Sequence, residues 1–427
     1  MNTETTPKIL AVFGQHDEKT LAQLRDVASR AEAAALMSDG HLGYVMPIGG
    51  VAAYEDKVSV VGVGFDIACG NAAIRTDLEL VDLVGFTREE LEANPSRARC
   101  REVGELADSI WGTISFGIGR RNTADDAPVD DPLFHDEAWW AIPNDGGYRD
   151  DLMGKARHQL GTVGSGNHYV DVFVDEEDAI WVGVHFGSRG FGHTIASDYL
   201  ALSLGQPRKS RVREEEVLLP LDSELGREYW ELMELAGRYA YAGREWVARK
   251  VVRDVLGAGE LELVHNHHNF AWREEHFGRE LVVVRKGATP AFPGQLGFVG
   301  GSMGDCAVIV EGSAPRTETD QELQQAALFS TVHGAGRVMS RTQAAGKVNR
   351  KTGRVKSPGA VSWPMLQEWL QREGVVLRGG GLDESPHAYR RLPEVLRAQG
   401  DTIRIIHTLR PLIVCMAGAD TFDPYKD

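Results

Sequence analysis

One hairpin limits the ways in which this chain can fold. The runs YVDVFV (169–174) and IWVGVHF (180–186) are rich in β-branched and aromatic residues, and the acidic run DEED (175–178) separates them. Such runs on either side of a short polar segment predict two antiparallel strands joined by a turn. We therefore expect β-sheet at the centre of the fold.

The register of this hairpin brings two histidines together. A hairpin centred on DEED pairs residues whose numbers add up to 353, which places His168 opposite His185. Directly opposite Cβ atoms lie about 4.5–5.5 Å apart, so the two imidazoles could share one metal ion. A cross-strand aromatic pair gives the same pattern without a metal, and a shift of one residue would separate the rings. The hairpin alone leaves both interpretations open.

Helical and strand-like segments are mixed along the chain without a regular βαβ alternation, which predicts an α+β fold with a β-sheet core. Helical spacing occurs at 18–33, 88–114 (with a break near Pro95), 151–161 and 221–259 (with a break or bend at its glycines), and strand-like runs at 281–287, 306–312 and 402–418. Residues 122–150 are rich in Asp, Pro and Gly and are expected to form a surface excursion. Because we find no linker and no fixed repeat, we expect residues 1–427 to form a single domain.

Composition limits the partners that we expect. The formal net charge is −16, whereas proteins that coat nucleic acid non-specifically are usually basic. Any contact with nucleic acid should therefore be local, at a strand end. No apolar run approaches the roughly 18 residues of a membrane span, and no signal peptide is evident, so we expect a cytoplasmic protein without membrane contact. The four cysteines lack CxxC spacing, which predicts free thiols, one of which could bind a metal.

Side chains that can bind a metal occur beside glycine-rich turns at four places. Asp66 and Cys69 lie in GVGFDIACG (62–70), His168 ends GNH, His185 begins HFGSRG, and the run HNHHNFAWREEH occupies 265–276. Carboxylate, thiolate and imidazole together suit Zn²⁺ or Mn²⁺ better than Mg²⁺, which prefers oxygen. A buried cysteine is more often a small apolar side chain. Glycine at each place nevertheless permits close approach of a ligand.

The stretch STVHGAGRVMSR (330–341) suggests an anion site. His333 stands directly before a glycine turn, and Arg337 and Arg341 follow it. A planar guanidinium suits phosphate oxygens, which is consistent with a phosphate site in which His333 is reactive. A flexible loop that leads into a helix, with solvated arginines, explains the same residues without chemistry.

Nine motifs resemble, in order, those of the RtcB family of RNA ligases. They span nearly the whole chain and are DGHLGYVMPIGG (39–50), VGFDIACG (63–70), QLGTVGSGNHYVD (159–171), HFGSRGFG (185–192), HHNFAWREEHFG (267–278), RKGATPA (285–291), GGSMG (300–304), VHGAGRVMSR (332–341) and GLDESPHAYR (381–390). The family joins an RNA 3′-phosphate or 2′,3′-cyclic phosphate to a 5′-hydroxyl. The resemblance implies an RtcB-like fold, in which helices flank a β-sheet core with a deep metal-binding cleft, and it implies an RNA ligase.

The resemblance also implies roles for individual residues. His333 would be the nucleophile that attacks the α-phosphate of GTP and carries GMP through a P–N bond. The ligands of two Mn²⁺ ions, with Cys69 bridging, would be Asp66, Cys69, His168, His185 and His268. The guanylate pocket would contain Asn167, Asp171, Asn269, Ser302, His333, Gly334, Ala335, Gly336 and Tyr389. Phosphate or RNA would meet Arg189, Arg337 and Arg341, and a protein activator would be a possible further partner.

The chain departs from the usual family pattern near the expected base site. The family commonly closes with Lys-Gly, whereas Ala417 and Gly418 stand here, and Phe186 and Gly300 replace a common serine and proline. These departures put guanine selectivity and rate in question.

Two alternatives therefore stand beside the ligase. One is a Mn²⁺-dependent phosphodiesterase or phosphatase acting on RNA ends, and the other is a non-catalytic paralogue that binds RNA ends.

Overall fold

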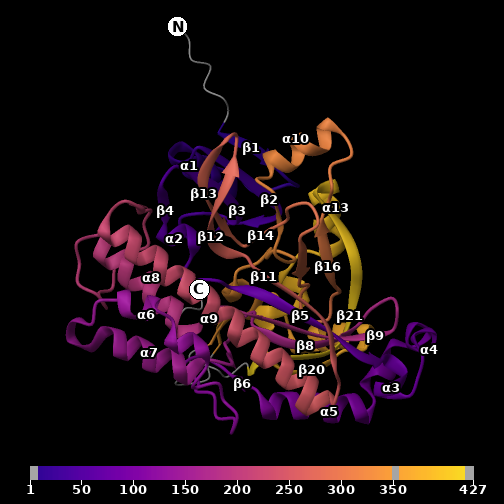
Figure 1. The fold of residues 1–427 in the computed structure, drawn as a ribbon. Coiled ribbons are helices and arrows are strands. Elements are labelled where there is room, and N and C mark those ends of the chain that lie inside the picture. Colours follow the sequence, from indigo (N-terminus) through magenta and orange to yellow (C-terminus); the bar gives the residue numbers. More distant parts are fainter. Residues whose placement is uncertain (1–7, 349–354, 419–427) are drawn as a thin grey trace.

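Two large β-sheets form the core of the computed structural model, which describes residues 8–348 and 355–418 (Figure 1). The five-stranded sheet, in the upper part of Figure 1, has the order β1 (Ile9–Val12), β2 (Ala33–His41), β3 (Ile48–Tyr54), β13 (Arg279–Lys286) and β12 (Asn269–His276). The eight-stranded sheet has the order β11 (Glu260–His267), β5 (Gly70–Glu79), β9 (Ala179–Phe186), β8 (Tyr169–Val174), β21 (Ile403–Gly418), β16 (Ala307–Gly312) and β15 (Leu296–Val299), with β20 (Val376–Gly380) parallel to β21.

Short ribbons and helices surround the two sheets. The ribbons are β10 (Leu218–Pro220) with β4 (Lys57–Ser59), β14 (Ala288–Pro290) with β17 (Ser330–Val332), β18 (Lys347–Val348) with β19 (Val355–Ser357), and β6 (Ser115–Phe116) with β7 (Thr162–Val163). The α-helices are α1 (Glu18–Arg30), α2 (Val60–Val63), α3 (Leu80–Val84), α4 (Arg88–Ala93), α5 (Arg101–Thr113), α6 (Ala138–Ala141), α7 (Tyr148–Gln159), α8 (Arg189–Ser203), α9 (Glu224–Lys250), α10 (Glu318–Ala326), α11 (Arg341–Ala345), α12 (Trp363–Glu373) and α13 (Leu392–Gln399). The 3₁₀-helices are η1 (Pro95–Arg99), η2 (Pro132–His135), η3 (Asp145–Gly147), η5 (Leu382–Glu384), η6 (Pro386–Ala388) and η7 (Gly400–Thr402).

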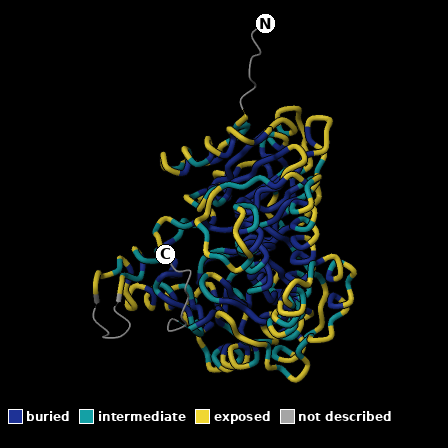
Figure 2. The backbone as a smooth tube through the Cα atoms, turned by 90° about the vertical axis from the view of Figure 1, so that its left-hand side faces the viewer, coloured by how far each residue is buried: buried dark blue, intermediate teal, exposed yellow. Residues whose placement is uncertain are grey.

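The predicted α+β class is confirmed. Helix α9 lies against β5 and β9, and α5 lies against β20 and β21. Figure 2 shows buried backbone in the interior with exposed segments around it. The predicted helix break near Pro95 is also confirmed, since η1 separates α4 from α5. No helix in the described residues is long and apolar enough to cross a membrane.

Two asparagine side chains draw the ends of the larger sheet together. Asn71 on β5 donates from Nδ2 to the Phe298 carbonyl on β15 at 2.8 Å, and Asn266 on β11 accepts the Phe298 N–H at 2.9 Å. An open sheet edge has unpaired backbone groups, and here two amide side chains satisfy them. The sheet is thereby almost closed.

The register predicted for the central hairpin is wrong by one residue. Tyr169, not His168, lies opposite His185. The loop has three residues because Asp175 already pairs with Ala179, and Asp178 takes a left-handed conformation with φ 67°. A type I turn followed by a left-handed residue is a common three-residue hairpin loop. His168 lies just before β8, but its ring centroid is still 5.5 Å from that of His185.

We had expected a break or bend at the glycines of the long helix, but α9 is not broken there. It runs through Gly226, Gly237 and Gly243 and ends in the π-helical turn η4 (Val251–Leu256). A Cβ atom at Gly237 would lie 2.9 Å from the Phe270 ring. The glycines therefore allow the helix to pack closely against its neighbours rather than interrupt it.

The segment 122–150 is mostly exposed or half-buried, as expected of a surface excursion, but a few side chains anchor it in the interior. Phe134 and Trp139 are buried, and the Trp139 ring centroid lies 5.1 Å from that of Phe191 on α8. Trp139 also donates its indole N–H to the Leu133 carbonyl at 3.0 Å. The abundance of Asp, Pro and Gly concealed these aromatic anchors.

We predict that Trp139→Ala lowers the free energy of unfolding by about 3–5 kcal/mol, because it leaves a large cavity. The neighbouring Trp140 is 63% exposed and lies over Arg149, so Trp140→Ala should change stability by less than about 1 kcal/mol. Thermal and denaturant unfolding of the two variants measure the difference. Equal stability of the two variants would contradict the anchoring role.

Candidate functional site

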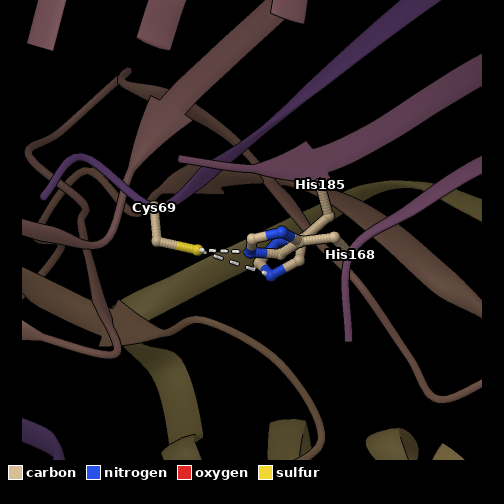
Figure 3. Close-up of side chains that lie close together, drawn as sticks. All are labelled: Cys69, His168 and His185. Atoms are coloured by element: carbon tan, nitrogen blue, oxygen red, sulfur yellow. Dashed lines mark hydrogen bonds between the residues drawn. The ribbon is translucent and has the colours of Figure 1, made fainter. Parts of the chain in front are cut away.

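Cys69, His168 and His185 lie together and could hold a metal ion (Figure 3). The Cys69 sulfur lies 3.8 Å from Nε2 of His168 and 3.6 Å from Nε2 of His185. Their three ligand atoms all lie within 4.8 Å of one another. The sequence analysis expected this group, although the hairpin register that it used is incorrect.

A strained loop places Asp66 and Cys69. The residues between α2 and β5 include Ala68, which has φ 59° although it is not glycine. A non-glycine residue in this region costs about 1–3 kcal/mol unless its surroundings hold it there. The Ala68 N–H donates to the Asn269 carbonyl at 2.7 Å, and its own carbonyl accepts a hydrogen bond from Arg244 at 2.9 Å. Both sides of the strained residue are therefore fixed.

His185 has a second partner that orients its ring. His185 donates from Nδ1 to the Asn71 side-chain carbonyl at 2.6 Å, which leaves Nε2 as an acceptor facing the sulfur. The Asn167 amide donates to the same Nε2 at 3.3 Å. Such partners fix the tautomer and orientation of a ligating histidine, so Nε2 of His185 is already aimed at the Cys69 sulfur.

Asp66 and Arg189 flank the other histidine. Nε2 of His168 lies 3.1 Å from the Asp66 carboxylate, and Nδ1 lies 3.4 Å from the Arg189 guanidinium. Burial opposes ionisation of Asp66, but the hydrogen bond and charge of His168, together with the charge of Arg189, lower the pKa of Asp66 to about 2. Asp66 is therefore an anion at neutral pH and suits a cation at this position.

His268 completes the ligand set that the resemblance implied. Its backbone N–H donates to the Cys69 carbonyl at 2.8 Å, and its ring stacks on that of His185 with centroids 5.2 Å apart. Nδ1 of His268 is buried without a hydrogen-bond partner among the described residues. Burial lowers the pKa values of His185 and His268, which keeps both rings neutral and able to bind a metal. The donor set of oxygen, sulfur and nitrogen fits a divalent ion such as Mn²⁺ or Zn²⁺.

His333 is held by a buried carboxylate that the sequence analysis did not single out. Nδ1 of His333 lies 2.6 Å from Oδ2 of Asp39, which also accepts the backbone N–H groups of His333 and Gly334 at 3.0 and 3.3 Å. Because a carboxylate accepts, the proton of the neutral ring resides on Nδ1 and Nε2 carries the lone pair. The ring centroids of His333 and His268 are 5.0 Å apart, so this lone pair lies close to the ligand set.

The arginines after His333 share one acidic partner. Arg337 lies 3.0 Å and Arg341 lies 3.2 Å from Glu384, and the Arg337 guanidinium lies 4.7 Å above the Tyr389 ring. Glu384 therefore compensates part of the charge that we expected to face phosphate. Residues 333–340 form a loop, and α11 begins at Arg341. A loop that leads into a helix is one of the two interpretations given above for this stretch. Arg337 lies in the loop and Arg341 begins the helix, so the two arginines do not share one helical face.

One cavity of about 1170 Å³ is lined by every residue to which the family resemblance assigned a role. They are Asp66, Cys69, Asn167, His168, Asp171, His185, Arg189, His268, Asn269, Ser302, His333, Gly334, Ala335, Gly336, Arg337, Arg341 and Tyr389. The hydrogen bonding of two of them, Asn269 and Asp171, differs. Asn269 accepts the Gly287 N–H at 2.8 Å, and Oδ1 of Asp171 is buried without a hydrogen-bond partner among the described residues. Burial raises the pKa of Asp171.

Four residues of this site were missed by sequence reasoning. Asp39 and Glu384 lie within quoted motifs, and Asn71 follows the motif that ends at Gly70. Arg244 is fully buried on the otherwise apolar face of α9. A charged residue at a core position of an amphipathic helix is rare unless it has partners, so Arg244 was detectable as an anomaly. Its partners could not be named from the sequence.

Comparisons with known proteins point to one family. Residues 19–417 match the family model described as tRNA-splicing ligase RtcB. The chain is 31% identical to "tRNA-splicing ligase RtcB" of Thermococcus kodakarensis, over 92% of this chain and 90% of that protein. It is 30% identical to "RNA-splicing ligase RtcB" of Escherichia coli K12, over 90% of each chain. It is also 30% identical to "RNA-splicing ligase RtcB homolog 1" of Entamoeba histolytica, over 88% of this chain and 79% of that protein.

We predict that Asn71→Leu weakens Mn²⁺ binding by about 10- to 100-fold, because His185 loses the acceptor that orients it. Asn266→Leu is the matched control, since Asn266 bonds the same Phe298 backbone but contacts none of the expected ligands. Isothermal titration with Mn²⁺ measures both affinities, and melting temperatures report on folding. Equal Mn²⁺ affinity in the two variants would contradict the orienting role of Asn71.

Proposed function

This chain belongs to the RtcB family, and from that premise we propose that it is an RNA ligase that joins a 3′-phosphate or 2′,3′-cyclic phosphate end to a 5′-hydroxyl end. We propose GTP as the nucleotide and two Mn²⁺ ions as the metals. The observation that carries the proposal is the position of His333. Its ring is oriented by Asp39 and lies beside His268 within the same cavity as Cys69.

The proposed reaction begins at Nε2 of His333. Its lone pair attacks the α-phosphorus of GTP, a P–N bond forms, the bond to the β-phosphate oxygen breaks, and pyrophosphate leaves. The ring then carries a positive charge, which the Asp39 carboxylate stabilises because its Oδ2 lies 2.6 Å from Nδ1. A carboxylate that holds an imidazole in this way fixes the productive tautomer and stabilises the imidazolium.

Two transfers would follow. An oxygen of the RNA 3′-phosphate attacks the α-phosphorus of the bound GMP and displaces the His333 nitrogen, which splits one difficult reaction into two easier ones. The RNA 5′-hydroxyl then attacks the phosphorus of the activated RNA end, and GMP leaves. A 2′,3′-cyclic phosphate end must first be opened by water.

The proposed ligands give the cavity a place for the metals. Asp66, Cys69, His168, His185 and His268 would hold the two ions, which when bound neutralise phosphate charge and stabilise entering and leaving oxygens. The Arg189 guanidinium is positively charged, as the metal ions are, and it lies 3.4 Å from Nδ1 of His168. It would orient a phosphate oxygen beside the ligand set through its planar guanidinium.

We predict that His333→Ala abolishes the nucleotide adduct formed with α-labelled GTP and Mn²⁺, because the attacking nitrogen is lost. Asp39→Asn should lower the rate of adduct formation by at least about 100-fold, since an amide can donate to Nδ1 and favour the wrong tautomer. Acid-labile labelling of the protein, followed over time, measures both effects. Wild-type protein that never forms an adduct would overturn the proposed mechanism.

The products of the wild-type reaction separate the ligase from its alternatives. Opening of a cyclic phosphate or release of phosphate without a joined strand would identify a phosphodiesterase or phosphatase. Binding of 3′-phosphorylated RNA that survives His333→Ala, with no turnover in the wild type, would identify a binding protein. A parallel reaction with α-labelled ATP tests whether Ala417, in place of the usual lysine, relaxes the choice of base.

A further inference from the structure

The central cavity extends well beyond the residues assigned above. It continues between α7, α8 and the segment 204–217. We call this part the α8 arm and define it by the lining residues Gln159, His193, Ser197, Lys209 and Arg211, with Tyr44 and Phe65 at its side. Ligand pockets are typically about 300–1,000 Å³, so a cavity of about 1170 Å³ has room for more than one nucleotide.

The α8 arm starts beside the expected metal ligands and follows one helix outward. Arg189, the first residue of α8, lies 3.4 Å from His168. Gly190, His193, Ser197 and Leu200 also line the cavity, and this spacing of three to four residues corresponds to one face of a helix. At 1.5 Å per residue, residues 190–200 extend about 15 Å. That length matches about four stacked nucleotides of a single strand at 3.4 Å each.

Cations outnumber anions along this arm although the chain as a whole is acidic. Lys155, Lys209 and Arg211 line it, and Glu214 is the carboxylate among the lining residues of the arm that the structure describes, while Asp151 and Asp198 act on Lys155 from nearby. Lys209 lies 3.4 Å from Asp151, but both side chains are about 70% exposed, so this ion pair is weak. Against a net charge of −16, a local group of cations indicates an anionic ligand.

An exposed aromatic ring lines the same cavity as these cations. Tyr44 is 55% exposed and packs edge-on against Phe65, whose ring centroid is 5.8 Å from that of His193 on α8. The ring of Tyr44 is thus positioned by its neighbours while much of it faces solvent. Aromatic rings beside a cationic groove are typical of proteins that bind single-stranded nucleic acid, because every base has a face that can stack.

We propose that the α8 arm binds single-stranded RNA next to the end being joined, with Lys209 and Arg211 on the backbone phosphates and Tyr44 stacked on a base. The proposal rests on the proposed function for the identity of the RNA. The arm would align a strand so that its terminal nucleotide reaches the ligand set beside Arg189.

The experiment measures binding of fluorescent single-stranded RNA of about eight nucleotides, twice the estimated footprint, by anisotropy over a range of salt concentrations. One RNA ends in a 3′-phosphate and the other has a 5′-hydroxyl with a free 3′-hydroxyl. Lys209→Gln combined with Arg211→Gln should weaken binding of one or both RNAs by about tenfold. It should also reduce the slope of log K against log salt by about 1.4, for two phosphate contacts at about 0.7 each.

Matched variants test the two kinds of contact. Arg213→Gln removes an exposed arginine that does not line the cavity and should leave RNA binding unchanged. Tyr44→Ala should weaken binding by about fivefold or more, whereas Tyr44→Phe keeps the stacking ring and should bind like the wild type. Melting temperatures of all variants control for folding.

Two outcomes would overturn the proposal. One is wild-type protein that does not bind single-stranded RNA. The other is equal weakening by Arg213→Gln and by the Lys209/Arg211 double variant, or no weakening by either. Adduct formation by the wild type with GTP alone needs no RNA, so its failure reports on the proposed function separately. Loss of RNA affinity in the double variant would support the α8 arm even if no adduct formed.

Discussion

A buried guanidinium ties together three of the segments that carry the proposed metal ligands. Arg244 on α9 donates to the carbonyls of Ala68 and Phe186 and to ring nitrogens of His265 and His267. These acceptors flank Cys69, His185 and His268 in sequence, and none of them is a carboxylate. Burial lowers the pKa of Arg244 to about 10, so the group remains a cation at neutral pH. A buried charge without hydrogen bonds would be prohibitive, and the ligand loops therefore have to close around it.

The site also depends on glycines at positions where any larger residue would collide with a site side chain. A Cβ atom at Gly187 would collide with the Asp66 carboxylate, and one at Gly164 would collide with Arg189 and His168. The glycines that mark the motifs thus serve close side-chain packing as much as turns. Ala68 and Arg189 take left-handed conformations without being glycine, with φ values of 59° and 57°. Such strain clusters at functional sites when the surrounding hydrogen bonds hold it in place.

Charge is distributed unevenly between the two ends of the cavity. Glu384 lies within ion-pair distance of Arg337 and Arg341, so the end near Tyr389 is partly neutralised. Around α8, the ion pair of Lys209 with Asp151 is exposed and weak, and Arg189 lies directly against the ligand set. A polyanionic strand would therefore be attracted mainly from the α8 side. An acidic protein can recognise a strand end in this way without general affinity for nucleic acid.

The sequence patterns were sufficient for the α+β class, the helix break near Pro95 and the free cysteines, and the resemblance to a known family supplied the list of residues that line one cavity. Patterns of apolar residues and glycine-marked motifs are local, so they can be read without coordinates. The hairpin register was decided by the left-handed Asp178 in the loop, and the anchoring of 122–150 by packing of Trp139 against Phe191. The partners Asp39, Asn71 and Arg244 lie far in sequence from some of the groups that they hold. Which polar groups meet is settled only when folding buries them and each must find a partner, and no local pattern records that choice.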